Sequence, residues 1–237
     1  MQEVAIWKEL ERFNILCDEK VSVENFAKDL SSVFELAQQR TNASKPHAMA
    51  SVLMRNAAFV YVSQLFILSK YRMKWSGDYG KVGLLDGDVN GRWSPMWVFP
   101  QGEWVPVEGD AETHSALQTL ICDQCRQLIK AVAKATKSSP FVLWENVWGY
   151  MLWMYVQLFQ ESSDIADRAR KDIEYFLRDE TWRGLERRSP FQKFLTGQTP
   201  EESMANYARI TCCLYYMIPG NDKCPYCPKV SNDRCLI

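Results

Sequence analysis

Histidine is scarce in this sequence, and so is an excess of charge of either sign. Only His47 and His114 occur among the 237 residues, so a catalytic zinc site rich in histidine is not expected. Lys and Arg number 28 and Asp and Glu 29, which gives a net charge of -1. Proteins that bind nucleic acid in general carry an excess of positive charge. We therefore expect no nucleic-acid partner.

The short motifs of several large enzyme classes are also missing. The sequence contains no G-x-x-x-x-G-K-[ST], no G-x-G-x-x-G, no G-x-S-x-G and no H-E-x-x-H. These absences argue against phosphate-binding loops, dinucleotide-binding units, nucleophile elbows and zinc-protease helices. Residues 86–91 match the first half of a calcium loop, but Trp97 replaces the acidic twelfth ligand. We expect a hairpin turn there.

Neither a leader sequence nor a membrane span is evident. Residues 1–10 carry Glu3, Lys8 and Glu9 and no apolar run, which favours a cytoplasmic, reducing environment. The apolar stretch 142–159 approaches the length of a membrane span. Because Glu145 and Asn146 interrupt it, we expect a buried central helix and no transmembrane segment. Peripheral association with a membrane stays open.

The composition and the hydrophobic pattern predict a mainly α fold with a small antiparallel β meander (α+β). Hydrophobic residues make up 47% and aromatic residues 13%, enough for a large aromatic core. Short strands are expected at 82–85, 93–99 and 103–107, which places the meander at about 80–108. The predicted helices are 2–16, one capped by Ser22 with Phe26, Leu30, Phe34 and Leu36 on its apolar side, 46–73, 111–137, 142–160 and 163–178. Residues 180–206 should connect through short helical pieces.

Cys122 and Cys125 form a C-x-x-C pair in the middle of a predicted helix. Redox C-x-x-C pairs normally open a helix after a strand. Two cysteines at this spacing within a helix are more often small buried apolar residues. We therefore expect them in the core.

The C-terminal part has a much denser group of thiols. Cys212, Cys213, Cys224 and Cys227 follow a C-C-x10-C-x2-C spacing, with a turn sequence at 219–222 between the pairs. The turn lets the two pairs fold towards each other. Four converging thiolates bind either zinc or an iron–sulfur cluster. The chain is thus predicted to comprise a helical body, 1–206, and a C-terminal Cys-rich segment, 207–237.

The spacing favours a two-iron cluster over zinc. A structural zinc site usually uses two C-x(2–4)-C pairs, and Cys224 with Cys227 fits that pattern. Cys212 and Cys213 do not, because adjacent side chains on an extended chain point to opposite sides. A cluster is a larger target than one ion and accommodates adjacent thiols more readily. Zinc, and plain core or disulfide cysteines, remain the alternatives.

The Cys pattern resembles that of the FhuF-like [2Fe–2S] ferric-siderophore reductases. It is preceded by Arg209-Ile210-Thr211 and followed by Pro228. Further likeness is seen in residues 143–146 (L-W-E-N) with Gly149, Tyr150 and Trp153, in residues 189–191 (S-P-F), in the strand 93–99 and in the helix 46–73. The resemblance spans most of 45–228 and is strongest at the C-terminus; it leaves 1–45 unexplained.

The resemblance implies a cytoplasmic oxidoreductase with a [2Fe–2S] cofactor. Cys212, Cys213, Cys224 and Cys227 would be its ligands, whereas Cys17, Cys122, Cys125 and Cys235 fall outside the pattern. The substrate would be an imported ferric siderophore, of hydroxamate or citrate-hydroxamate type. The electron would come from an unidentified donor, such as a ferredoxin, a flavodoxin or a reductase. Iron would be released as Fe(II) for assimilation.

A dock for the chelate should be partly basic, because many ferric siderophores are anionic. The candidate contacts are Arg55, Arg209 and Lys223, with Tyr215 and Tyr216 as stacking or covering groups beside the cluster. Trp144 and Asn146 are expected to be buried, the amide satisfying backbone groups. Two alternative functions stay open: a siderophore-binding module with a structural zinc site held by the four cysteines, and an iron–sulfur electron carrier for a protein partner.

Overall fold

The computed structural model describes residues 2–17, 24–26, 29–100 and 102–230. The fold is mainly helical with small sheets, as the sequence predicts. Its helices are α1 (Gln2–Leu10), α2 (Leu30–Thr41), α3 (Pro46–Tyr71), α4 (Gly109–Leu117), α5 (Arg126–Thr136), α6 (Pro140–Leu158), α7 (Ser163–Leu177) and α8 (Pro200–Ala205). Its strands are β1 (Ile15–Cys17), β2 (Glu24–Asn25), β3 (Met73–Trp75), β4 (Gly83–Leu85), β5 (Asp88–Val89), β6 (Arg92–Trp93), β7 (Met96–Phe99) and β8 (Trp104–Pro106).

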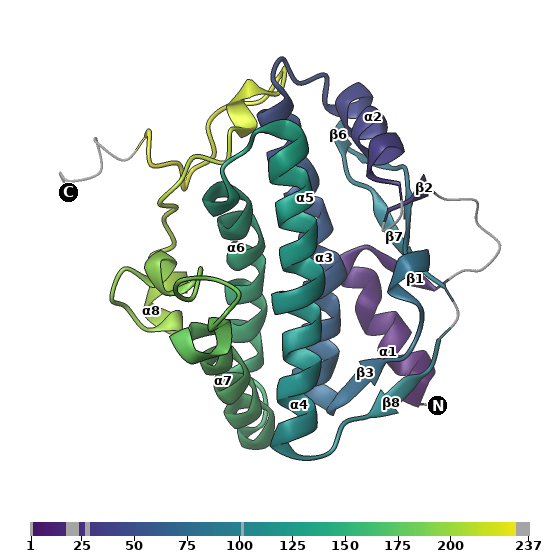
Figure 1. The fold of residues 1–237 in the computed structure, drawn as a ribbon, viewed down its shortest axis with the longest axis vertical. Coiled ribbons are helices and arrows are strands. Elements are labelled where there is room, and N and C mark those ends of the chain that lie inside the picture. Colours follow the sequence, from purple (N-terminus) through teal and green to yellow (C-terminus); the bar gives the residue numbers. More distant parts are fainter. Residues whose placement is uncertain (1, 18–23, 27–28, 101, 231–237) are drawn as a thin grey trace.

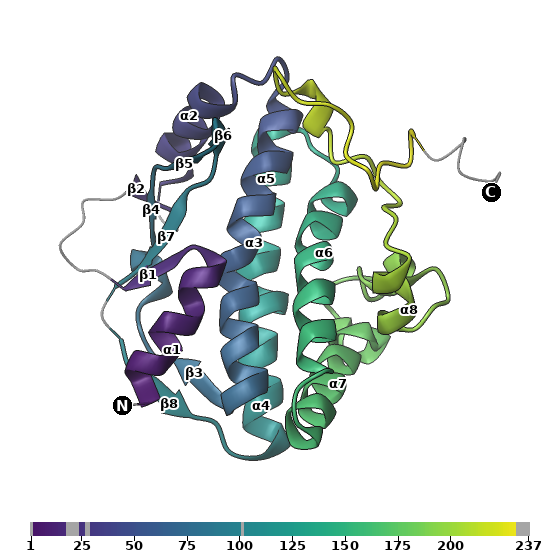
Figure 2. The ribbon, with the colours of Figure 1, turned by 180° about the vertical axis from the view of Figure 1, so that it is seen from behind.

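Helix α3 is the centre of the fold. It packs against α2, α5, α6 and α7, and Figure 2 shows it between the strands and α1 on one side and α6 and α7 on the other. Among the described helices it alone is long and apolar enough to cross a membrane, and 83% of that stretch is buried inside the protein. Such burial is typical of a core helix. Helix α6, predicted as a buried central helix, packs along α3 with most of its residues buried.

Two of the predicted N-terminal features differ from the structure. The first helix, α1, ends at Leu10 and a 3-10 turn follows at Glu11–Phe13. The left-handed Asn14, with a φ of 56°, ends that turn, and Ile15 then pairs with Trp97 in a parallel ladder. The second helix begins at Leu30, where the Asp29 side chain accepts the N–H groups of the first turn. The proposed cap Ser22 lies outside the described residues.

The strand region contains antiparallel pairs but not a simple meander. The main sheet has the order β1-β7-β4-β2, with β4 antiparallel to both of its neighbours and β1 parallel to β7. Strand β8 instead pairs with β3, directly after α3. Between β4 and β7, β5 and β6 form the expected hairpin, in which Asn90 and Gly91 adopt φ values of 55° and 75°. Both residues therefore have the left-handed backbone of a tight hairpin turn.

The segment predicted as helix 111–137 is one continuous helical run with a wide π-helical turn inside it. Gln118–Cys125 has the π form between α4 and α5. Cys122 and Cys125 lie within this turn, and both are fully buried, as expected. After α7, residues 179–205 contain two short 3-10 turns and α8. The C-terminal segment then crosses to the end of the bundle where α3 begins (Figure 1).

Candidate metal centre

The four C-terminal cysteines lie together, in two pairs. The Sγ atoms of Cys212 and Cys227 are 3.7 Å apart, and those of Cys213 and Cys224 are 3.8 Å apart. Two sulfurs that bind one tetrahedral metal at about 2.3 Å are separated by a chord of about 3.8 Å. Each pair therefore has the separation of two thiolates that share a metal.

The pairs are interleaved along the chain, since each joins one member of Cys212-Cys213 to one member of Cys224-x-x-Cys227. The chain turns sharply after the adjacent pair, because Leu214 has a left-handed φ of 60° and its N–H donates to the Cys212 sulfur at 3.4 Å. The second pair spans a tight turn in which the Cys227 N–H donates to the Cys224 carbonyl at 3.0 Å. These two turns bring together two arms of the segment, one that carries Cys212 and Cys213 and one that carries Cys224 and Cys227.

The donor set fits a binuclear group better than a single ion. Within the described part of the chain, no three His, Cys, Asp or Glu side chains converge to hold one metal ion. Two separate thiol pairs are instead what a group with two metal atoms requires. Four thiolates are also the ligand set of a [2Fe–2S] cluster. The residues present therefore fit such a cluster, and zinc fits less well.

Burial affects the thiols before any metal binds. It raises the pKa of Cys212, and it raises the pKa of Cys224 to about 11, with the nearby Cys213 thiol adding to the effect. Both groups are then protonated at neutral pH in the metal-free protein. Binding a metal therefore requires the release of these protons.

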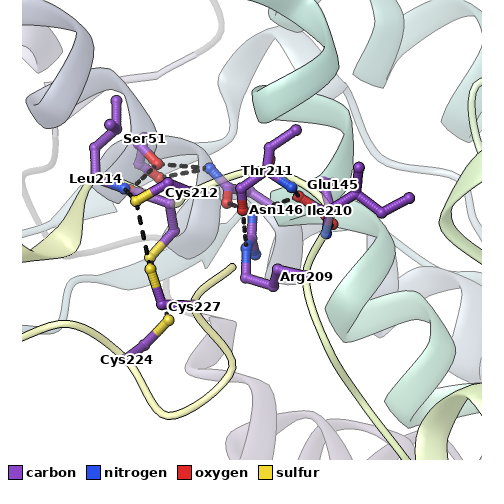
Figure 3. Close-up of polar contacts among 11 residues, drawn as sticks. Ser51, Glu145, Asn146, Arg209, Ile210, Thr211, Cys212, Leu214, Cys224 and Cys227 are labelled. Carbon is purple, nitrogen blue, oxygen red and sulfur yellow. Dashed lines mark hydrogen bonds and ion pairs between the residues drawn. The ribbon is translucent and has the colours of Figure 1, made fainter. Parts of the chain in front are cut away.

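A buried carboxylate on α6 holds the arm that leads into Cys212. Glu145 is 2% exposed, and its oxygens accept the backbone N–H groups of Ile210 at 2.6 Å and Thr211 at 2.8 Å. The Thr211 hydroxyl also donates to it. The guanidinium of Arg209 completes the group with an ion pair at 3.2 Å. Glu145 thus fixes three consecutive residues directly before the first cysteine (Figure 3).

A second set of polar contacts ties the cysteines to α3. The Ser51 hydroxyl donates to the carbonyl of Cys213 at 2.6 Å. Asn146 donates to the hydroxyl and the carbonyl of Ser51 at 2.9 and 3.1 Å, and accepts from Arg209 at 2.8 Å. As Figure 3 shows, these contacts join α3, α6 and the Cys segment in one buried network. The expected role of the Asn146 amide, satisfying backbone groups from a buried position, is confirmed.

Aromatic packing completes the attachment of the segment. The Tyr207 ring packs over Gly149 of α6, where a side chain would meet its hydroxyl, and contacts the Tyr226 ring edge-on at 5.2 Å. The Arg209 N–H donates to the Tyr226 carbonyl at 3.1 Å, which joins the two arms. Ser189 and Phe191 are buried instead, with Phe191 stacked on Trp148 at 5.2 Å. Trp144 is buried as expected.

The five candidate docking residues fall into separate places. The Arg55 guanidinium lies over the Tyr215 ring at 5.1 Å, and both line an open cavity of about 480 Å³. Tyr216 instead contacts Lys229, and Lys223 is exposed. Arg209 is only 7% exposed and is engaged by Glu145 and Asn146. Its contacts make it a positioning residue for the Cys segment, and its contact with a chelate stays a prediction.

Glu145, Ser51 and the β5–β6 hairpin did not emerge as site residues from the sequence. One signal for Glu145 was present, because a carboxylate and an amide interrupt the otherwise apolar helix 142–160. A buried charge is costly without a partner, so such an interruption points to a specific contact. Ser51 carries no comparable signal.

The comparisons with known proteins identify no relative: no family model, no curated protein and no solved structure matches this chain.

Proposed function

We propose that this protein is a ferric-siderophore reductase with a [2Fe–2S] cluster bound by Cys212, Cys213, Cys224 and Cys227. The observation that carries the proposal is the pairing of the four thiols at 3.7 and 3.8 Å on a buried polar network. The C-C-x10-C-x2-C spacing and its resemblance to the FhuF-like family support it independently. The same resemblance implies a cytoplasmic location, which is part of this proposal.

The reaction is a one-electron reduction. Fe(III) in the chelate gains one electron and becomes Fe(II), while a low-potential donor such as a ferredoxin, a flavodoxin or a reductase loses one. Fe(II) binds anionic oxygen ligands more weakly and sits low in the divalent affinity order, so the chelator loses most of its hold. When bound, the cluster supplies the electron by outer-sphere transfer. No general base or nucleophile is required, which agrees with the lack of catalytic motifs.

The chain's own residues hold and orient the ligands. Glu145 and Arg209 fix the approach to Cys212, and Ser51 fixes the carbonyl of Cys213. Hydrogen bonds and solvent exposure around the sulfurs tune the potential of an iron–sulfur cluster. In this protein the Leu214 N–H donates to the Cys212 sulfur. Cys213 and Cys227 are each 3% exposed.

The test is anaerobic purification followed by visible and EPR spectra before and after reduction, with iron and sulfide counted. The proposal predicts a red-brown protein with a rhombic signal on reduction, and Fe(II) release from ferric chelates that a ferrous-specific dye traps. A colourless protein with one zinc after attempted reconstitution would leave a binding module. A reducible cluster with no turnover on any ferric chelate would indicate an electron carrier.

A further inference from the structure

The cavity beside the cysteines has walls from four parts of the chain. Arg55 and Asn56 come from α3, Tyr150 from α6, Tyr215 from the turn after the cysteines, and residues 89–94 from the β5–β6 hairpin. Its volume of about 480 Å³ is within the usual range for small-molecule sites. The hairpin and α3 therefore both line this cavity. Trp97 ties that sheet to α3 through its indole N–H, which donates to the Asn56 carbonyl at 3.0 Å.

The charge of this cavity has one sign. Arg55 and Arg92 line it, and no carboxylate does. Within the described part of the chain, neither guanidinium forms an ion pair. Of the two acidic residues near the hairpin, Asp86 pairs with Arg40, whereas Asp88 is exposed and accepts the Gly91 N–H. A half-buried cation without a counter-charge favours an anion in the adjoining space.

Arg55 also links the cavity to the cysteines. It lies one helical turn after Ser51, whose hydroxyl donates to the Cys213 carbonyl. The Tyr215 ring beneath its guanidinium follows Cys213 by two residues. A ligand held at Arg55 would therefore lie next to the Cys213–Cys224 pair.

We propose that this cavity docks ferric chelates of net negative charge, such as citrate-based hydroxamates with a free carboxylate, through Arg55 and Arg92. The proposal rests on the proposed function and narrows its substrate class. Neutral trihydroxamate chelates gain nothing from two guanidinium groups, so they bind more weakly. Long-range attraction between the chelate and the arginines also makes the preference weaker at high salt.

The experiment uses redox-inert gallium(III) complexes and the purified protein, so that binding is measured without turnover. Calorimetry compares a negatively charged citrate–dihydroxamate complex with a neutral trihydroxamate complex. We expect the anionic complex to bind at least tenfold tighter, and Arg55→Gln and Arg92→Gln each to weaken it about tenfold, as for a charge-assisted hydrogen bond. The neutral complex should be unaffected. Arg183→Gln, at an exposed arginine on the turn after α7, is the matched control.

Arg92 is exposed, so its substitution tests the dock even if Arg55→Gln perturbs the fold. Equal affinity for the two complexes, or no effect of either variant, would overturn the dock. The two proposals fail separately. A colourless protein that still binds the anionic complex through these arginines would support the docking proposal and refute the reductase. A red-brown protein that reduces chelates without dependence on either arginine would support the reductase and refute the docking proposal.

Discussion

The carboxylate of Glu145 lies 3.2 Å from the guanidinium of Arg209, and both side chains are buried, at 2% and 7% exposed. The two residues are far apart in the sequence, one in α6 and the other just before the cysteines. Their contact fixes where the C-terminal segment attaches to the helical body. The stability of this attachment can be measured directly.

Glu145→Gln keeps the size of the side chain and removes its charge. We expect the free energy of unfolding to fall by about 3–5 kcal/mol, because Arg209 is left buried without a counter-charge. Urea unfolding measures the change. Glu174→Gln is the control, since the Glu174–Arg178 pair is 60% exposed on both sides and should contribute at most about 1 kcal/mol. Similar losses for the two variants would contradict the structural role of Glu145.

The sulfur pairing predicts two classes of serine variants. Cys212→Ser and Cys227→Ser should produce one altered EPR spectrum, and Cys213→Ser and Cys224→Ser another, because in the proposed cluster the two cysteines of each pair would bind one iron. The pairing can also be tested in the metal-free protein, by mild oxidation followed by peptide mapping of the disulfides. The expected disulfides are Cys212–Cys227 and Cys213–Cys224, whose sulfurs start 3.7 and 3.8 Å apart. The pairing would be refuted if Cys212→Ser shared its spectrum with Cys213→Ser, and Cys224→Ser shared its spectrum with Cys227→Ser.

Gly149→Ala should loosen the C-terminal segment, because the new methyl group meets the Tyr207 hydroxyl. Overpacking of this kind typically costs about 1–3 kcal/mol, and thermal unfolding detects it. Tyr207→Phe removes the clashing oxygen and leaves the ring at an ordinary contact distance of 3.4 Å from the added carbon. We therefore expect the double variant to be more stable than Gly149→Ala alone. Equal stability of the two would show that Tyr207 moves away freely.

The buried thiols of Cys122 and Cys125 predict alkaline destabilisation. Burial raises the pKa of Cys122 to about 12 and that of Cys125 well above its usual value of 9.0. The unfolded chain ionises these thiols from about pH 9, whereas the folded chain keeps them protonated. Their contribution to the free energy of unfolding is thus fully present below pH 9. It is lost as the pH rises towards 12, at up to about 1.4 kcal/mol per pH unit for each thiol.

The check is urea unfolding at several pH values between 8 and 10.5. Cys122→Ala/Cys125→Ala should show a shallower loss of stability with pH than the parent protein, whatever its absolute stability. Alkylation at pH 8 gives a second readout. Cys17 is exposed and should be modified in the folded protein, whereas Cys122 and Cys125 should react only after unfolding. If the double variant lost stability with pH as steeply as the parent protein, groups other than these two thiols would account for the loss.

Local patterns predicted the long elements well. The apolar run 46–73 and the observed helix Pro46–Tyr71 differ by two residues at one end, because Pro46 starts the helix and the left-handed Arg72 ends it. The helix prediction for 2–16 was wrong beyond the 3-10 turn that ends at Phe13, because Ile15 pairs with Trp97, a partner that lies 82 residues away in the chain. Strand β8 shows the same effect, since it pairs with β3 and not with its neighbour in sequence.

In the candidate site, too, local features could be predicted from the sequence and contacts between distant residues could not. The spacing of the thiols and the turn between them are local, and they predicted that the four cysteines lie together. Arg209 was predicted as a basic dock residue, and its sequence neighbours do not reveal its buried ion pair with the carboxylate on α6. The Ser51–Cys213 hydrogen bond joins residues 162 positions apart, which no local pattern specifies. Arg92 and Arg55 line the same cavity although they are 37 positions apart, a proximity that no local pattern specifies either.

The hydrogen bonds to Ser51 and Glu145 also set an order of assembly. Both partners belong to helices that precede Cys212 in the chain, and none of the four thiols belongs to the hydrophobic core that those helices form. The four thiols therefore attach to a core that does not depend on their side chains. Metal loading then becomes a maturation step on a finished scaffold. If the four thiols hold the proposed cluster, cells starved of iron or sulfide would accumulate a folded, inactive precursor and not a misfolded chain.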